Sequence, residues 1–444
     1  MDRFLTLSNL LLFASLASAE TEVERLRRDL DAERRARTLL EQRLAALESS
    51  RPATGDAMRR EIEAYLAERE EPAPKSRGLG DLIALSVVLD MHAGVSTASD
   101  EALASIALGD HDPKVRGFNV RNEELVVTAD VDPYFFALLD VVLKIDEEGE
   151  SSLELEEAYA LTTSLPASLQ LKVGQFFTDF GRVNPLHPHA WEFHNRPVML
   201  GRVLGGDGWR GQGARLSWIA PTLPLTLLAG AQNARGETQA AFLGEEGGEI
   251  GDHTQLARSV RSPADLAYHA RAEATHEFGQ TSALIGLSFG TGPNATGPDA
   301  VSRLYGFDLH LKWQPPATDA GWPFVAWQSE FALRDFEADA QDGVAARRYR
   351  DWGLYTQVVW AFRRPWTVAL RLDHASSDGA FAGDHDRLSV ALTYVTSEFA
   401  RIRLQVAYDE LRGLALAVPG ASDGNWSLWL GFSFSLGKHG AHRY

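Results

Sequence analysis

Three histidines and one glutamate lie close together in the sequence and have side chains that can bind a metal ion. His187, His189 and His194 fall within eight residues, and Glu192 lies between the second and the third. Neutral imidazoles and a carboxylate suit Zn²⁺ or a similar borderline divalent cation. Prolines interrupt the spacing, which matches no recognised metal motif, and histidines in polar loops are most often only solvated. The sequence therefore requires no cofactor, and it leaves a site for Zn²⁺ or another divalent cation as one interpretation.

A second histidine pattern repeats along the chain. Gly-Asp-His occurs at 109–111, 251–253 and 383–385, each time in a segment with the composition of a loop. If these loops converge at one end of the fold, we expect them to form a binding site for a divalent cation. The side chains concerned are Asp110, His111, His253, Asp384 and His385. The alternative is again that they are solvated loop residues.

The elements that would position these residues alternate with a period of two. From about residue 78 onward, segments of roughly 10 to 12 residues place apolar and polar side chains on opposite faces, which is the length a tilted strand needs to cross a bilayer. In 351–362, for example, Trp352, Leu354 and Val358 share one face. We expect about sixteen such strands. Their starts are expected near residues 81, 122, 134, 152, 168, 212, 224, 265, 281, 302, 323, 350, 366, 387, 400 and 425.

The links between these segments alternate between short and long. Short turns on one rim, long loops on the other and an even strand count are typical of an outer-membrane barrel. The fold class expected is therefore an all-β membrane barrel, antiparallel and transmembrane, with an N-terminal α-helical coiled coil. The soluble alternative, a large β-sandwich or propeller, is expected to have shorter strands and no systematic difference between alternate loops.

Charged side chains of both signs occupy the third long loop, 179–211. Such a loop folds into the lumen in porin-like barrels, where mixed charge creates a transverse field that sets ion preference. The predicted constriction residues in or next to this loop are Arg182, Arg196, Arg202, Arg210, Glu192 and Asp207, and those on lumen faces of strands are Lys172, Arg371, Arg401 and Arg403. The alternative places the loop charges on the external surface.

The N-terminal part has a different organisation. Residues 1–19 are typical of a cleaved secretory signal, with an apolar stretch and small residues before Glu20. Apolar residues at alternating spacings of three and four predict a periplasmic coiled coil over 20–50, and 51–77 reads as a helix and a proline-containing linker. The barrel is expected over 78–437 and a periplasmic tail over 438–444. A lone solvated helix is the alternative to the coil.

Composition excludes several classes of protein. The chain has 444 residues, of which 45% are hydrophobic and 9% aromatic, too many for a disordered polymer. It has no cysteine, which excludes disulfide frameworks and thiolate metal sites. A net charge of −18 argues against nucleic acid as a partner.

Two stretches carry a resemblance to known families. Glu156-Glu157-Ala158-Tyr159 and the segment from Val173 to Gly181 resemble the fourth and fifth strands of phosphate-selective porins. Residues 80–220, with Asp112-Pro113-Lys114 and Asn184-Pro185-Leu186-His187, resemble a group of outer-membrane proteins named zinc-regulated receptors. The second resemblance implies metal involvement. Energy-coupled receptors carry an N-terminal plug domain. In this sequence a coiled coil is expected at that position, which argues against active uptake.

The function expected is a porin-like channel in the Gram-negative outer membrane for passive diffusion of small hydrophilic solutes or ions, linked to zinc or another divalent metal. Its expected partners are outer-membrane lipid, those solutes and further copies of the chain, in a homotrimer formed through the coil and the barrel wall. The alternatives are a structural envelope tether without transport and a metal-binding receptor. No Gly-x-Ser-x-Gly elbow occurs, so we do not expect an enzyme.

Overall fold

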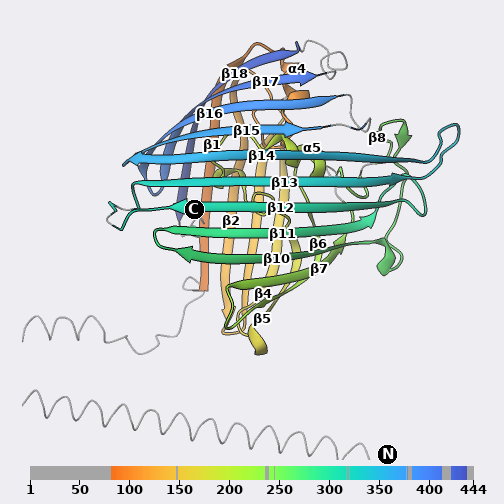
Figure 1. Ribbon diagram of the computed structural model, residues 1–444, viewed down its shortest axis with the longest axis horizontal. Helices are drawn as coiled ribbons and strands as arrows, with labels where there is room; N and C mark the ends of the chain where they lie inside the picture. Colours follow the sequence, from red (N-terminus) through yellow and green to blue (C-terminus); the bar gives the residue numbers. More distant parts are fainter. Residues whose placement is uncertain are drawn as a thin grey trace, which may run out of the picture. The chain divides into compact units, whose positions relative to one another are not determined.

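The computed structural model describes residues 82–146, 149–235, 240–244, 246–316, 318–319, 321–376, 378, 383–412 and 422–437. In this part of the chain, sixteen antiparallel strands form one closed barrel (Figure 1). The barrel strands are β1 Ile83–Ser96, β2 Gly117–Asp132, β3 Phe135–Ile145, β4 Ser151–Thr162, β5 Leu169–Phe177, β6 Arg210–Ile219, β7 Leu225–Asn233, β10 Leu266–Phe278, β11 Thr281–Pro293, β12 Val301–Trp313, β13 Phe324–Ala338, β14 Arg347–Arg363, β15 Trp366–Ala375, β16 Asp384–Ser397, β17 Ala400–Arg412 and β18 Gly424–Gly437. A separate hairpin, β8 Glu249–Ile250 and β9 His253–Thr254, lies in the link after β7.

The first and last strands close the barrel. β1 pairs with β18 from Ser86 opposite Gly437 to Ser96 opposite Ser427, while its other edge pairs with β2. Closure leaves no strand edge in the ring, which is a condition for crossing hydrocarbon because unpaired backbone groups find no water there.

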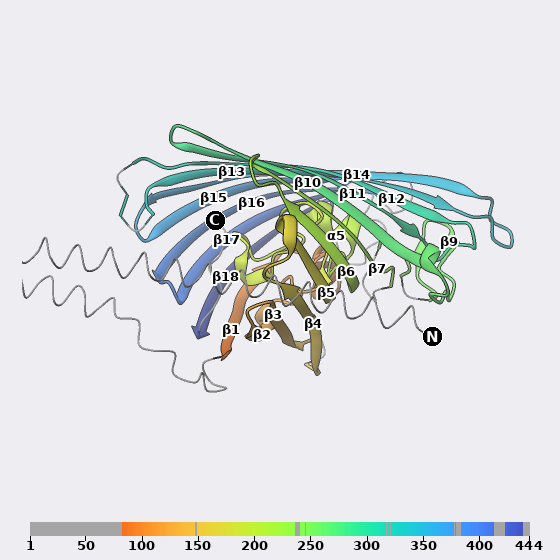
Figure 2. The same ribbon diagram turned by 90° about the horizontal axis from the view of Figure 1, so that it is seen from below.

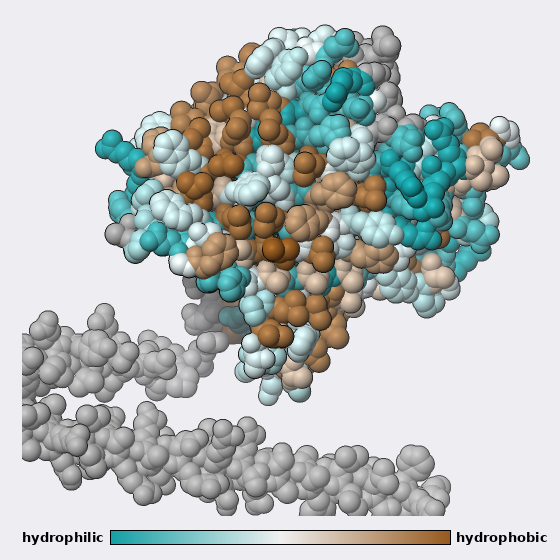
Figure 3. Space-filling view, viewed as in Figure 1, coloured by the Kyte–Doolittle hydropathy of each residue, from teal (hydrophilic) through white to brown (hydrophobic). Residues whose placement is uncertain are grey.

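Side chains alternate between the two faces of the wall, as the sequence predicted. In β14, Trp352 and Leu354 are exposed on the outer face, whereas Asp351 and Tyr355 are fully buried on the inner face. Apolar side chains gather over the strands, and hydrophilic ones cover the end of the barrel where β8 lies (Figure 3). The outside is therefore apolar and the inside polar.

The two rims differ in the length of their links. Four links on one rim contain two residues each: 133–134, 279–280, 364–365 and 398–399. The opposite rim carries the long links, including 178–209 and 234–265. The predicted alternation of short and long loops is confirmed.

Most predicted strand starts lie within two residues of the observed ones, but three strands begin earlier. β2 begins at Gly117 instead of 122, β14 at Arg347 instead of 350, and β16 at Asp384 instead of 387. The added residues are mostly polar and pair with neighbouring strands at the long-loop rim, where an apolar pattern is not needed. The predicted signal, coil, linker and C-terminal tail lie outside the described residues.

Two short helices lie in the long loops, α4 Asp100–Ile106 and α5 Val198–Leu204. No helix in the described ranges is long and apolar enough to span a membrane. Ser99 caps α4 by accepting a hydrogen bond from the amide of Ala102, and Leu103 and Ile106 of this helix pack against Leu411 and Trp429 of the wall.

Candidate channel constriction

The link between β5 and β6, residues 178–209, folds into the lumen; we call it the lumen loop. In both ribbon views α5, which belongs to this loop, lies within the ring of strands (Figure 1, Figure 2). All seven residues of α5 are buried. A helix that is apolar apart from one arginine, Arg202, is stable when protein surrounds it, and α5 packs against β13, β14 and β15.

Asn184 holds the two ends of the lumen loop together. Its side-chain amide donates to the carbonyls of Thr178 (2.8 Å) and Trp209 (3.0 Å), and its carbonyl accepts from the Trp209 amide (3.0 Å) and from Arg196 Nη2 (2.9 Å). The Thr178 amide also donates to the Trp209 carbonyl at 2.9 Å. One buried side chain thus satisfies four polar groups at the point where the loop leaves the wall.

Strands β15 and β17 form one side of the lumen, which we call the basic wall. This wall holds the lumen loop mainly through the backbone of the loop. Arg371 donates to the carbonyl of Asn195 (3.0 Å) and to its side chain (3.0 Å), and Arg403 donates to the carbonyl of Trp191 (2.7 Å). Arg401 donates to the carbonyl of His189. These arginines are anchors for the loop as well as charges in the lumen.

A different side, the acidic wall of β2, β3 and β4, contacts the loop through ionisable side chains. His187 Nδ1 lies 2.8 Å from Glu156 Oε2, and its Nε2 lies 3.2 Å from Glu157 Oε2. His189 Nδ1 lies 2.7 Å from Glu124 Oε2. The rings of His187 and His189 stack at 5.9 Å.

The structure separates the predicted histidine cluster into two groups. His187 and His189 face the acidic wall, whereas the ring of His194 lies 4.5 Å from His92 and its Nε2 lies 3.2 Å from the carbonyl of Arg403. A Cβ at Gly431 would lie 2.1 Å from His194 Cε1, so this position in β18 must stay without a side chain. Glu192 lines a hollow elsewhere in the lumen. A short turn at Pro188–Ala190 lies between His187 and His194, and these four residues do not form one ligand set.

The pKa values of His187 and His194 are shifted in opposite directions by their surroundings. Burial alone would lower the pKa of His187, but the carboxylates of Glu124, Glu156 and Glu157 outweigh it and raise the pKa well above its ordinary value. Burial lowers the pKa of His194 well below its ordinary value, and Arg403 adds to this effect. The two histidines therefore lie in opposite electrostatic environments.

The three Gly-Asp-His loops also have separate environments in the described part of the chain. His253 Nδ1 lies 3.0 Å from the Tyr349 hydroxyl, and His385 Nε2 lies 2.7 Å from Asp409 Oδ1. Asp384 is the first residue of β16, next to His385. The predicted convergence of the three loops on one cation is therefore not what the structure has. Each histidine is held by its own strand partners.

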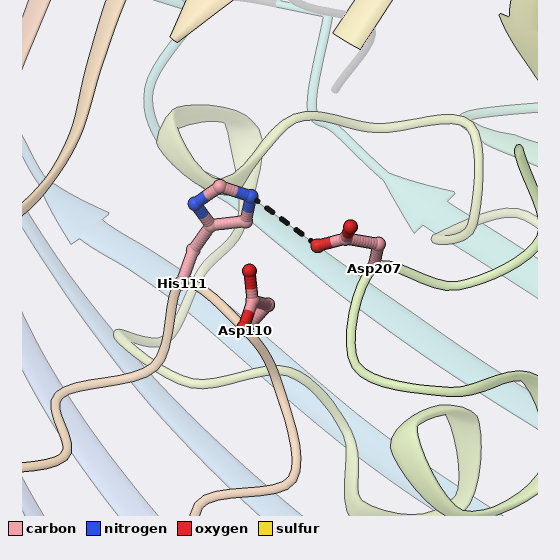
Figure 4. A group of neighbouring side chains, drawn as sticks. All are labelled: Asp110, His111 and Asp207. Carbon is pink, nitrogen blue, oxygen red and sulfur yellow. Dashed lines mark ion pairs between the residues drawn. The ribbon is translucent and has the colours of Figure 1, made fainter. Parts of the chain in front are cut away.

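Asp110 and His111 instead meet Asp207 at the end of the lumen loop (Figure 4). His111 Nε2 lies 2.8 Å from Glu156 Oε1 and 3.8 Å from Asp207 Oδ1. Lys144 forms ion pairs with Asp110 and Asp207, so this group contains a permanent cation.

The predicted constriction residues divide into anchors and residues next to open space. Arg196 and Arg202 are buried: Arg196 bonds Asn184 and, through its amide, Asp112, and Arg202 donates to the carbonyl of Gly383. Their predicted role as pore charges is replaced by a structural one, because each guanidinium is used inside the fold.

The remaining members lie at the edges of the lumen loop or beside a hollow. Arg210 pairs with Glu154 and with Asp207. Lys172 lies over the Tyr159 ring at 4.1 Å. Arg182 and Glu192 line the hollow between the loop and strands β12 to β15, together with His310, Gln357 and Arg371. This hollow is the candidate constriction, because charged side chains of both signs border it.

Several residues of the site were not singled out as site residues from the sequence. Glu124, Asp140 and Gln405 are buried lumen residues on strands, and Asn184 lies within the loop. The alternation of the strands could have placed the first three on the lumen face. Which loop residue each one meets depends on the path of the loop, which has no periodicity.

No family model matches the chain. A curated relative, an uncharacterized protein of Aquifex aeolicus (strain VF5), is 32% identical over 311 residues, which are 66% of this chain. The chain spans 63% of the length of that relative.

Two solved structures have a similar fold. The anion-selective porin from Comamonas acidovorans gives a TM-score of 0.50 at 10% identity, over 80% of this chain and 99% of the porin. The outer membrane channel DcaP of Acinetobacter baumannii gives 0.55 at 12% identity, over 80% of this chain and 97% of that one. The chain has the sixteen-stranded fold of outer-membrane porins.

Proposed function

We propose that the chain is a passive channel of the outer membrane for small hydrophilic solutes or ions. The observation that carries this proposal is the division between an apolar outer wall and a lumen of buried charged side chains. An apolar exterior suits lipid, and a sixteen-stranded barrel is wide enough to enclose an aqueous passage. Two channels of known structure share the fold, one of which is described as anion-selective.

The charges around the lumen suggest selection by a transverse field. The acidic wall contributes Glu124, Asp140 and Glu156, and the basic wall contributes Arg371 and Arg403, with the lumen loop between them. Opposed charges across a narrow passage orient dipolar solutes and set ion preference. Mixed charge at the hollow favours a weakly selective channel, and the resemblance to phosphate-selective porins stays a prediction.

Reconstitution of the purified full chain into planar bilayers tests the proposal. We expect discrete conductance steps and a reversal potential in unequal salt that lies close to zero, measured with and without Zn²⁺. Folded protein that inserts but gives no steps would favour the alternative of a structural tether without transport.

Self-association is a separate part of the proposal. It rests on the apolar spacing in residues 20–50, which lies outside the described residues. Crosslinking of the chain in detergent should give a trimer that is weakened when 20–50 is deleted. Monomer alone from both proteins would contradict it.

A further inference from the structure

Three side chains from two strands and the lumen loop converge at the acidic wall. One donor atom each from Glu124, Asp140 and His187 lies within 4.8 Å of the other two. His187 Nδ1 is 3.6 Å from Asp140 Oδ2 and 4.0 Å from Glu124 Oε1. Ligands at about 2.1 Å from a tetrahedral Zn²⁺ are separated by roughly 3.4 Å. The two distances from His187 Nδ1 are close to this separation.

Asp140 contributes a buried carboxylate oxygen whose hydrogen-bonding capacity is not satisfied. It is 2% exposed, and its Oδ1 has no hydrogen-bond partner among the residues that the structure describes. Glu124 and Glu156 are also buried, at 1% and 0% exposure. Burying several carboxylates without compensating charge costs several kcal/mol, so such a cluster calls for a cation.

The neighbouring group of Asp110, His111 and Asp207 has a cationic side chain of the protein beside its carboxylates. Asp110 and Asp207 lie next to His111 (Figure 4). The ammonium of Lys144 forms ion pairs with both carboxylates, and Arg210 pairs with Asp207. Among the side chains that the structure describes, the ion-pair partners of Glu124 and Asp140 are histidines only.

The orientation of His187 also suits a metal ligand. Its Nε2 lies 3.2 Å from Glu157 Oε2, and its Nδ1 faces Asp140 and Glu124. A carboxylate that accepts from the distal ring nitrogen fixes the tautomer and raises the basicity of the nitrogen that binds the metal. Glu156 Oε2, at 2.8 Å from Nδ1, provides a further oxygen on the same side.

We infer that Glu124, Asp140 and His187 bind one divalent cation of the Zn²⁺ class, which joins the lumen loop to β2 and β3. An imidazole with two carboxylates favours Zn²⁺ or Co²⁺ over Mg²⁺ and Ca²⁺, which prefer oxygen ligands. The positive ion compensates the charge of the buried carboxylates. The site differs from the ligand set predicted from the sequence, because two of its three ligands come from the wall. It goes beyond the channel function and does not depend on conduction.

The test is metal binding by the full chain, purified in detergent and stripped with a chelator. Calorimetric titration with Zn²⁺, and the visible absorption of Co²⁺ in a site of low symmetry, should both show one equivalent per chain. Asp140→Asn keeps the shape of the side chain and removes its charge, and His187→Gln removes the nitrogen ligand. Each substitution should weaken Zn²⁺ binding by more than roughly 10- to 100-fold, which is the loss typical when a residue that hydrogen-bonds a metal ligand is replaced.

His385→Gln is the matched control, because His385 is a buried lumen histidine with a carboxylate partner, Asp409, on a different part of the wall. It should bind Zn²⁺ as the unchanged chain does. Heat-modified migration on gels identifies the folded fraction of each variant, and only that fraction is titrated. The inference is overturned if the stripped chain binds no Zn²⁺, or if the folded Asp140→Asn and His187→Gln variants bind it as tightly as the control.

Discussion

The basic and acidic walls hold the same loop by different kinds of contact. The basic wall donates from Arg371, Arg401 and Arg403 to backbone carbonyls of the lumen loop. The acidic wall meets the side chains of His187 and His189. Backbone contacts tolerate changes in the loop sequence but fix the loop path, whereas side-chain contacts depend on two histidines. The first wall therefore determines where the loop lies, and the second determines its local charge.

The largest expected effect is at the basic wall. Arg371→Ala removes two hydrogen bonds to Asn195 and leaves Asp373, 2.7 Å from Arg371 Nε, without this partner. Breaking a buried charge pair costs about 3–5 kcal/mol. We expect a lower unfolding midpoint in denaturant and a larger single-channel conductance, since the loop loses an anchor. Unchanged conductance and stability would show that the basic wall does not hold the loop.

A smaller effect is expected at the acidic wall. His189→Gln keeps a donor near Glu124 but loses the imidazole that stacks on His187. The loss of free energy of unfolding should be about 1 kcal/mol, the range of a single net hydrogen bond. Denaturant titration of this variant beside Arg371→Ala measures the ratio. An equal or greater loss in His189→Gln would reverse the ranking of the two walls.

The smallest effect on stability is expected for substitutions at the hollow. Their effect is measured as a change in ion selectivity. Arg182→Gln removes a positive charge and should shift the reversal potential toward cation preference, and Glu192→Gln should shift it toward anion preference. The two variants control for each other because both keep a long polar side chain. Shifts of the same sign would show that these residues do not border the conducting path.

The barrel was predictable from the sequence because membrane strands repeat a simple rule. Alternation in segments such as β14 and tight links such as 364–365 identified the strands, their approximate starts and the two rims. The errors fall at polar strand ends such as Gly117, where hydrogen bonding continues after the apolar pattern stops.

The site was predictable only in part. The third long loop and the lumen arginines Arg371 and Arg403 were identified, but Arg196 was expected to be a pore charge and is an anchor. The histidines were grouped by nearness in sequence, whereas His187 and His194, with a turn at Pro188–Ala190 between them, contact different walls. Each contact between the lumen loop and a wall joins residues that are far apart in the sequence. No local sequence pattern indicates which residues will meet.

The central claim is that the lumen loop crosses a conducting barrel and limits its passage. The loop ends are adjacent, with the Thr178 amide 2.9 Å from the Trp209 carbonyl, so a short glycine linker can replace residues 180–207 without straining β5 or β6. The decisive measurement is the single-channel conductance of the unchanged and shortened chains in planar bilayers. We predict discrete steps for the unchanged chain and steps several-fold larger for the shortened one. Equal steps, or no steps from folded protein of either kind, would contradict it.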